Sequence, residues 1–288
     1  MERKLGIIGG SGVYQIDGLQ GAHWQQLETP WGAPSDSILS GHLNGLPMCF
    51  LPRHGRGHVH LPAEVPARAN IAALKALGCT DLVAVSAVGS LREDFRPGDM
   101  VVLDQIIDRT VARPASFFGQ GCVAHVSLAD PFCADLSKAC AAALTATGAT
   151  FHQGGTYLAM EGPQFSSRAE SRMYRQWGAD VIGMTAMPEA RLAREAELCY
   201  ASVAMVTDYD CWHESHGAVD VAQVIAVLEK NAGTAKAMIA ALPAHLAATK
   251  APCPCGCDRA LDHAVMTAPA AHNPATVERL RSIAGRVL

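Results

Sequence analysis

The chain has 288 residues, of which 49% are apolar and 17% charged, and its formal net charge is −4. A chain of this length can bury a substantial core, and its apolar content excludes intrinsic disorder. The weak negative charge argues against nucleic acid or an anionic membrane as a partner, because such binders present a basic face. No apolar run reaches the roughly 20 residues of a membrane helix, and no signal peptide is recognisable, so we expect a cytoplasmic protein.

Short apolar runs alternate with helical spacing in the first half of the chain. The first run enters a glycine-rich turn, and Ala67–Leu77 has the spacing of a helix that ends at Gly78. The runs typical of strands are Lys4–Ile8, Ser37–Ser40, Pro47–Leu51, Asp81–Ala87, Met100–Leu103 and Ile106–Ile107.

The second half continues the alternation. Ser167 and Glu170 form a capping box that predicts a helix running to Trp177. Further helices are predicted at Leu136–Thr147, around Glu189–Ala196 and at Val219–Leu242, and further strands at Thr156–Met160, Asp180–Gly183 and Ala201–Thr207.

This alternation predicts an α/β fold: a single-domain three-layer α/β/α arrangement with a mixed central sheet and helices on both faces. The composition changes only near the C-terminus. We therefore predict a main domain over residues 1–250. Residues 251–288 are predicted to be an extension rich in Cys, Pro and Ala, with a short helix near Pro274–Ile283.

Ten cysteines are many for a cytoplasmic chain, and most lie in apolar contexts typical of buried free thiols. The unusual cluster is Cys253-Pro-Cys255-Gly-Cys257. Zinc sites usually combine two C-x-x-C pairs, and no second pair follows this one. A zinc site and a redox or disulfide role stay open as alternatives, but an exposed tail segment without chemistry is favoured.

Two segments that follow predicted strands could bind an anion. Gly9-Gly10-Ser11-Gly12 offers backbone N–H groups and a hydroxyl, although a plain tight turn is the alternative. Arg53 and His54 follow an apolar strand, and Arg53 could clamp a phosphate with its guanidinium fork. The alternative there is a solvated basic loop. A metal site at His54 and His58 is disfavoured, because the intervening glycines make a helix poor, and no metal is predicted.

Two further strand ends carry residues suited to a ligand. Ser86 and Ala87 lie in a run of small residues that lets a ligand approach the backbone closely. Asp208 and Asp210 leave an apolar strand on one face, where a partly buried carboxyl can act as a general acid. A helix N-cap or a structural hydrogen bond is the alternative for this pair. Phe165 and Met184 could hold a sugar and a base, and are equally typical of core packing.

Together these motifs resemble the 5′-methylthioadenosine phosphorylases of the trimeric purine nucleoside phosphorylase superfamily, from about Leu5 to Leu242. The resemblance rests on Gly-Ile-Ile-Gly-Gly-Ser-Gly, Arg-His-Gly-Arg, Val-Gly-Ser-Leu-Arg, Glu-Gly-Pro-Gln-Phe-Ser-Ser-Arg-Ala-Glu, Met-Thr and Asp-Tyr-Asp-Cys-Trp. The tail after Ala244 does not match the animal enzymes, and its Cys-x-Cys is reminiscent of archaeal members that contain disulfides.

The resemblance implies reversible phosphorolysis of methylthioadenosine in purine and methionine salvage, by a homotrimer or a dimer of trimers. Inorganic phosphate is a co-substrate, and no cofactor is implied. The implied phosphate site is Ser11, Arg53, His54, Ser86, Ala87 and Thr185. The implied nucleoside site is Phe165, Met184, His58, His125, Val219, Ala222, Asp208 and Asp210, with His125 lent by a neighbouring subunit.

The resemblance also implies the chemistry of the two aspartates. Asp208 would donate a proton to the purine N7, and Asp210 would accept from the exocyclic 6-amino group. Because carboxylates favour a 6-aminopurine over a 6-oxopurine, a methylthioinosine or inosine phosphorylase is the alternative that the pair argues against.

Overall fold

The computed structural model describes residues 2–10, 13, 16–213 and 221–288, with side chains except at 221–226. Seventeen regular elements are described in these ranges, apart from short 3₁₀ turns. The strands are β1 (Leu5–Gly9), β2 (Gln20–Gln25), β3 (Ile38–Leu43), β4 (Leu46–Pro52), β5 (Asp81–Ser90), β6 (Met100–Val102), β7 (Gln105–Arg109), β8 (Phe151–Gln153), β9 (Thr156–Met160), β10 (Val181–Gly183) and β11 (Cys199–Asp208). The helices are α1 (Ala67–Ala76), α2 (Ala134–Thr147), α3 (Arg168–Gln176), α4 (Ala186–Glu195), α5 (Val221–Ala241) and α6 (Pro274–Ala284).

The strands form one mixed sheet around β5. Strands β4, β1, β5 and β11 are parallel neighbours, so their carboxyl ends meet at one edge of the sheet. Strand β10 pairs antiparallel with β5, and β6 pairs antiparallel with β11. In parallel sheets, the carboxyl ends of the strands are where ligands bind.

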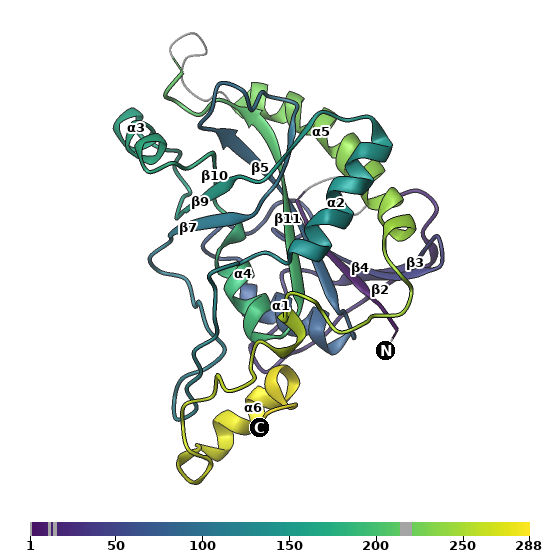
Figure 1. Cartoon of the computed structure of the whole chain (residues 1–288), viewed down its shortest axis with the longest axis vertical. Helices are drawn as coiled ribbons and strands as arrows, with labels where there is room; N and C mark the ends of the chain where they lie inside the picture. Colours follow the sequence, from purple (N-terminus) through teal and green to yellow (C-terminus); the bar gives the residue numbers. More distant parts are fainter. Residues whose placement is uncertain (1, 11–12, 14–15, 214–220) are drawn as a thin grey trace.

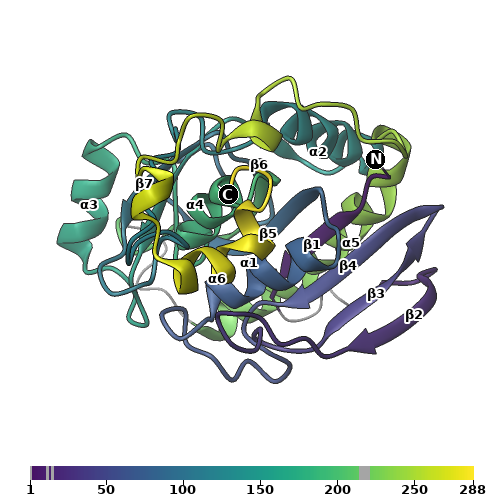
Figure 2. The same cartoon turned by 90° about the horizontal axis from the view of Figure 1, so that it is seen from below.

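Helices cover both faces of the sheet, as Figures 1 and 2 show. The period-two alternation of β1 sends Ile8 into one core with residues of α1 and α4, and Ile7 into the other with residues of α2 and α5. Helices α2 and α5 lie side by side on their face, and α1 and α4 on theirs. The predicted three-layer α/β/α arrangement with a mixed sheet is therefore confirmed.

Two strands were not predicted, for different reasons. Strand β2 is exposed along most of its length and pairs only with β3 at the edge of the sheet, so its sequence shows no apolar alternation. Strand β8 has three residues, too few for a period to be recognised. The capping box of Ser167 and Glu170 at the start of α3 is present as predicted.

The C-terminal segment packs against the rest of the molecule. Leu280 and Ile283 of α6 are buried in the core that contains α1 and α4. The expectation of an exposed segment around the cysteine cluster is wrong for Cys253 and Cys257, which are 8% and 1% exposed, and right only for Cys255. The error arises because long-range packing buries these residues, and local composition does not reveal it. Among the described residues, no helix has the length and apolar character required to cross a bilayer.

Candidate active site

A cavity of about 270 Å³ opens at the edge where the carboxyl ends of β4, β1, β5 and β11 meet. Its wall brings together ten of the residues predicted from the sequence, although they come from five separated segments. These ten are Arg53, His54, His58, Ser86, Ala87, Phe165, Met184, Thr185, Asp208 and Asp210.

Four predicted residues are not placed in this cavity. Ser11 and Val219 lie outside the described residues, and the side chain of Ala222, near the start of α5, also lies outside them. His125 is exposed and away from the cavity wall, on a segment whose backbone pairs with Ala264. Within one chain the structure therefore does not bring His125 to the other predicted residues.

Arg53 is 2% exposed at the end of β4, and Glu189 of α4 neutralises its charge. Its Nε donates to Glu189 Oε1 at 2.6 Å and its Nη2 to Oε2 at 3.2 Å. Two more donors bind the carbonyl oxygens of Val85 and Ile8. Four of the five N–H donors of Arg53 are thus engaged, which leaves one on Nη1 and rules out the expected bidentate clamp.

His54 is neutral at physiological pH, because burial and the neighbouring charge of Arg53 lower its pKa to about 4. Its Nδ1 lies 3.0 Å from the carbonyl oxygen of His60, which can only accept, so Nδ1 carries the proton. The Nε2 atom of this tautomer is an acceptor. His54 can therefore accept a hydrogen bond from a ligand at Nε2, but cannot donate one there.

Two buried hydroxyls on the wall, Ser86 Oγ and Thr185 Oγ1, have no hydrogen-bond partner among the described residues. Thr185 is held in place by its backbone N–H, which donates to the hydroxyl of Tyr157 at 3.1 Å. Gly183 makes this contact possible, because a Cβ there would collide with the same hydroxyl. Buried hydroxyls normally find partners, so this pair indicates a site for an oxygen-rich ligand.

Asp208 and Asp210 form the other part of the wall, at the end of β11. Asp208 accepts from the Thr207 hydroxyl at 2.8 Å and from the Asp210 backbone N–H at 2.7 Å. Burial raises the pKa of both carboxyls, and the charge of Asp208 raises the pKa of Asp210 further. Asp210 Oδ2 is buried without a well-aligned hydrogen bond in the described part of the chain, although Ser171 lies beside it. These carboxyls are suited to holding or donating a proton.

The two parts of the wall are separated along β5. The Arg53 guanidinium binds the carbonyl of Val85, next to Ser86, whereas a Cβ on Gly89 would lie 3.0 Å from Asp208 Oδ1. Ser86 and Gly89 are three residues apart along β5, which corresponds to about 10 Å in a strand. A phosphate, a ribose and a purine in line can fill such a span.

Sequence reasoning missed Arg113, which holds the Met184 segment in place. Its side chain is 4% exposed, and it donates to the carbonyl oxygens of Met184 and Met187 and to the backbone carbonyl of Glu161. Nothing in the local sequence marks this arginine, because all three partners lie about 50 to 75 residues away. Arg113 is a positioning residue for the wall of the cavity.

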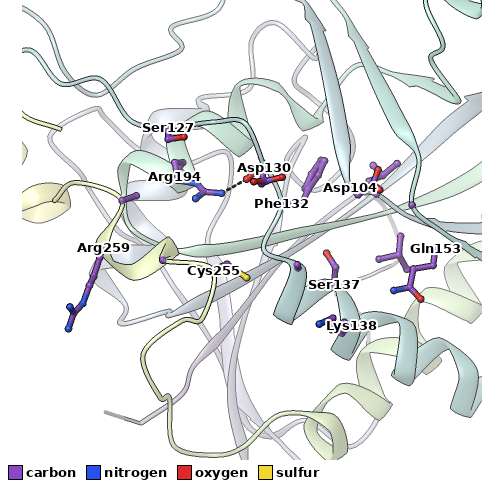
Figure 3. A pocket seen from close by; sticks show the side chains of 16 residues that line it. Asp104, Ser127, Asp130, Phe132, Ser137, Lys138, Gln153, Arg194, Cys255 and Arg259 are labelled. Atoms are coloured by element: carbon purple, nitrogen blue, oxygen red, sulfur yellow. Dashed lines mark hydrogen bonds between the residues drawn. The ribbon is translucent and has the colours of Figure 1, made fainter. Parts of the chain in front are cut away.

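A second, larger pocket of about 990 Å³ lies between α2 and the C-terminal segment (Figure 3). Its wall is mixed, with the cations of Lys138, Arg194 and Arg259 around it, and Arg194 donates to the backbone of Asp130. None of the predicted site residues lines it. The smaller cavity is therefore the candidate active site, because it combines unpartnered hydroxyls with carboxyls of raised pKa.

Comparison with known proteins agrees with this geometry. Residues 4–243 match the phosphorylase superfamily, and this chain belongs to that superfamily.

The relatives within the superfamily share one name. The chain is 64% identical to the S-methyl-5′-thioadenosine phosphorylase of Cereibacter sphaeroides, over 100% of this chain and 99% of that one. It is 57% identical to the protein of the same name from Rhodospirillum rubrum, covering 99% and 97%. A methylthioadenosine phosphorylase from an Antarctic soil metagenomic library has a crystal structure that superposes with a TM-score of 0.92, at 47% identity over 98% and 99% of the two chains.

Proposed function

We propose that this chain catalyses the reversible phosphorolysis of S-methyl-5′-thioadenosine to adenine and 5-methylthioribose 1-phosphate. The observation that carries the proposal is one cavity with two hydroxyls in one part of its wall that have no partner among the described residues, and two buried carboxyls in the other part. The relatives' common name supports the substrate.

Phosphate is assigned to the part of the wall formed by Ser86, Thr185 and the turn after β1, whose Gly10 also lines the cavity. The hydroxyls donate to phosphate oxygens, and Arg53 contributes its one remaining N–H. His54 accepts a hydrogen bond from a protonated phosphate oxygen, because only its Nε2 acceptor is left. Ser11, predicted from the sequence, remains part of this proposal.

The purine is assigned to the aspartates, with Phe165 and Met184 flanking the nucleoside. Asp208 donates its proton to N7, and Asp210 accepts from the 6-amino group with its poorly bonded Oδ2. A 6-oxopurine would place a carbonyl oxygen against that acceptor. Such a mismatch can discriminate by about 10⁴.

In the proposed reaction, a phosphate oxygen forms the new bond to C1′ while the bond from C1′ to N9 breaks. The electron pair of that bond passes to the purine, and N7 takes the proton of Asp208. Positive charge develops on the sugar and is stabilised by the phosphate beside it, so positioning does most of the work. The reaction requires no metal and no organic cofactor, because phosphate is itself the nucleophile.

Asp208→Asn tests the proposal. The amide keeps the shape but has no carboxyl proton for N7, so we expect kcat for methylthioadenosine to fall about 10²–10⁴-fold. The measurement is release of adenine, with phosphate present and then absent. Activity that persists without phosphate would indicate a hydrolase instead.

Asp130→Asn is the matched control, because Asp130 lines the second pocket and the same change there should leave kcat unaltered. Methylthioinosine provides the second comparison. Undiminished cleavage of methylthioadenosine by the Asp208 variant, or wild-type preference for methylthioinosine, would refute the proposed role of the aspartates.

We further propose that the chain works in the cytoplasm as a homotrimer or a dimer of trimers. None of the ten cysteines is in a disulfide, as expected in a reducing compartment. His125 lies away from the cavity of its own chain, so it can serve a ribose only in the cavity of a neighbouring copy. Val59, Leu61 and Phe165 are exposed at or beside the cavity mouth, and apolar surface of this kind favours association.

A further inference from the structure

The active site does not involve a group of four cysteines at the opposite end of β11 from Asp208. Cys133, Cys199, Cys253 and Cys257 place their sulfur atoms within 4.8 Å of one another, and each is less than a tenth exposed. Among the described residues, these four cysteines are the one group of three or more His, Cys, Asp or Glu side chains that is close enough to share a metal ion. We propose that these four cysteines bind a structural zinc ion.

The sulfur distances fit a shared ion better than disulfides. The Sγ atoms of Cys133 and Cys253 are 3.7 Å apart. A tetrahedral zinc ion with Zn–S bonds of about 2.3 Å has S···S edges of about 3.8 Å, whereas a disulfide requires about 2.05 Å. The widest pair must close by about 1 Å, which small rotations of the side chains allow. Four thiolates in a tetrahedron are the ligand set of a closed structural zinc site.

Three separate parts of the fold supply the ligands. Cys133 is the N-cap of α2, and Cys199 is the first residue of β11. Cys253 and Cys257 come from one tight turn, in which the N–H of Gly256 donates to the carbonyl of Cys253 at 2.9 Å. Gly256 has φ +70°, the left-handed conformation that glycine adopts without strain. This turn directs both sulfur atoms to one point.

Positively charged groups lie beside two of the sulfur atoms, and cysteine binds a metal as the thiolate. The ammonium group of Lys250, whose side chain is 9% exposed, donates to Cys199 Sγ at 3.1 Å and to Asp81 at 2.6 Å. The N-terminus of α2 brings its positive dipole end to Cys133. A Zn²⁺ ion with four thiolates has a net charge of −2, and Lys250 and the N-terminus of α2 offset part of this charge.

The second pocket lies beside the cluster. Cys255 and Gly256 line it from the turn that carries two of the ligands, and Phe132 and Ala134, on either side of Cys133, line it too (Figure 3). The spacing in the sequence conceals the site, because the usual second C-x-x-C pair is replaced by one cysteine before α2 and one at the start of β11. Zinc would join the C-terminal segment to both elements.

Metal analysis of the full-length chain, purified without added metal or chelator, is the first test. We expect about one zinc per chain after gel filtration, and X-ray absorption should show four sulfur neighbours at about 2.3 Å. Removing the zinc with a thiol-blocking mercurial and a chelator should lower the melting temperature by several degrees. Absence of metal, disulfides among these cysteines in anaerobically purified protein, or iron in place of zinc would overturn the assignment.

Single substitutions identify the ligands. Cys257→Ser and Cys199→Ser should each lose the zinc, because three sulfur ligands hold the ion much less tightly. Cys255→Ser is the matched control in the same turn and should keep it. Zinc retained by Cys257→Ser, or lost only from Cys255→Ser, would refute this ligand set. If Cys199→Ser fails to fold, the metal content and the X-ray absorption spectrum of the unaltered chain still show whether four sulfur atoms bind zinc.

Discussion

Single residues carry the chemistry of this site at a cost in stability. Asp208 ends the buried strand β11 and Asp210 follows it, and burial raises the pKa of both carboxyls. The ionised forms are therefore less favourable in the folded chain than in the unfolded chain. The same desolvation that makes Asp208 a proton donor opposes folding once the proton is gone.

This cost predicts a pH-dependent gain in stability for Asp208→Asn. A carboxyl with a raised folded pKa stabilises the fold at low pH, and the contribution is lost as the pH rises through that pKa. The variant should therefore melt a few degrees above the unaltered chain at pH 7.5, with the difference shrinking as the pH falls and vanishing below about pH 3, where the carboxyl is protonated in both states. Thermal melts across this range provide the measurement. An equal difference at every pH would contradict the electrostatic origin.

Much of the cavity wall could be predicted from single residues, because unusual polar groups follow apolar strands. Arg53 follows the end of β4 and Asp208 is the last residue of β11, and local sequence reveals both, whereas Ser86 lies within β5, which runs on to Ser90. Their partners could not be predicted. Glu189 occupies the fork of Arg53 from 136 residues away, and Arg113 holds Met184 from 71 residues away. Such pairings depend on the tertiary fold, which local patterns do not encode.

At the scale of elements, the contact between β5 and the end of β11 positions the carboxyl pair. The register between the two strands shifts between Val206 and Asp208, where the chain turns toward the cavity. Gly89 of β5 leaves room for this turn, because a Cβ there would lie 3.0 Å from Asp208 Oδ1 and 3.3 Å from Asp210 Cβ. The absence of a side chain at Gly89 of β5 thus determines where Asp208 and Asp210 lie at the end of β11.

Gly89→Ala should therefore impair catalysis more than folding. The added methyl group pushes Asp208 away from the purine, and we expect kcat/KM to fall about 100-fold, as for other small misplacements of a catalytic group. Steady-state kinetics and a melting curve measure the two effects.

Gly233→Ala makes the same chemical change within α5, where an added Cβ meets no atom within 4 Å. It should leave kcat/KM unaltered and stabilise the chain by about 0.5–1 kcal/mol, because alanine favours a helix over glycine. Equal kinetic losses in the two variants would show that the close packing at Gly89 is not what positions the acids.

The overall fold could be predicted because the same pattern, an apolar run followed by a helical segment, recurs along most of the chain. Alternating apolar runs and helical segments indicated three layers, and the strand ends met at one edge as parallel topology requires. The burial of the C-terminal segment was not predictable in this way. Leu280 and Ile283 pack in the same core as Ile71 of α1, which lies about 200 residues earlier in the chain. The composition of the C-terminal segment alone suggested an exposed tail.

The proposed assembly predicts that inactive subunits can complement each other. If His125 acts in a neighbour's cavity, His125→Ala should reduce activity, and a trimer that contains both His125→Ala and Asp208→Asn subunits should have about one intact site in three. Co-expression with two different tags, purification of the mixed species and an adenine-release assay measure this recovery. Full activity of His125→Ala, or no recovery in the mixed species, would contradict a shared site.

The ion pair between Arg53 and Glu189 also bears on how the co-substrate reaches the site. Within the described wall, the one arginine is already neutralised by a buried carboxylate, His54 is uncharged, and the chain as a whole is acidic. The entrance therefore exerts little long-range pull on a dianion, and capture depends on short hydrogen bonds made after random encounter. Such capture depends little on ionic strength, so kcat/KM for phosphate should change little between low and high salt.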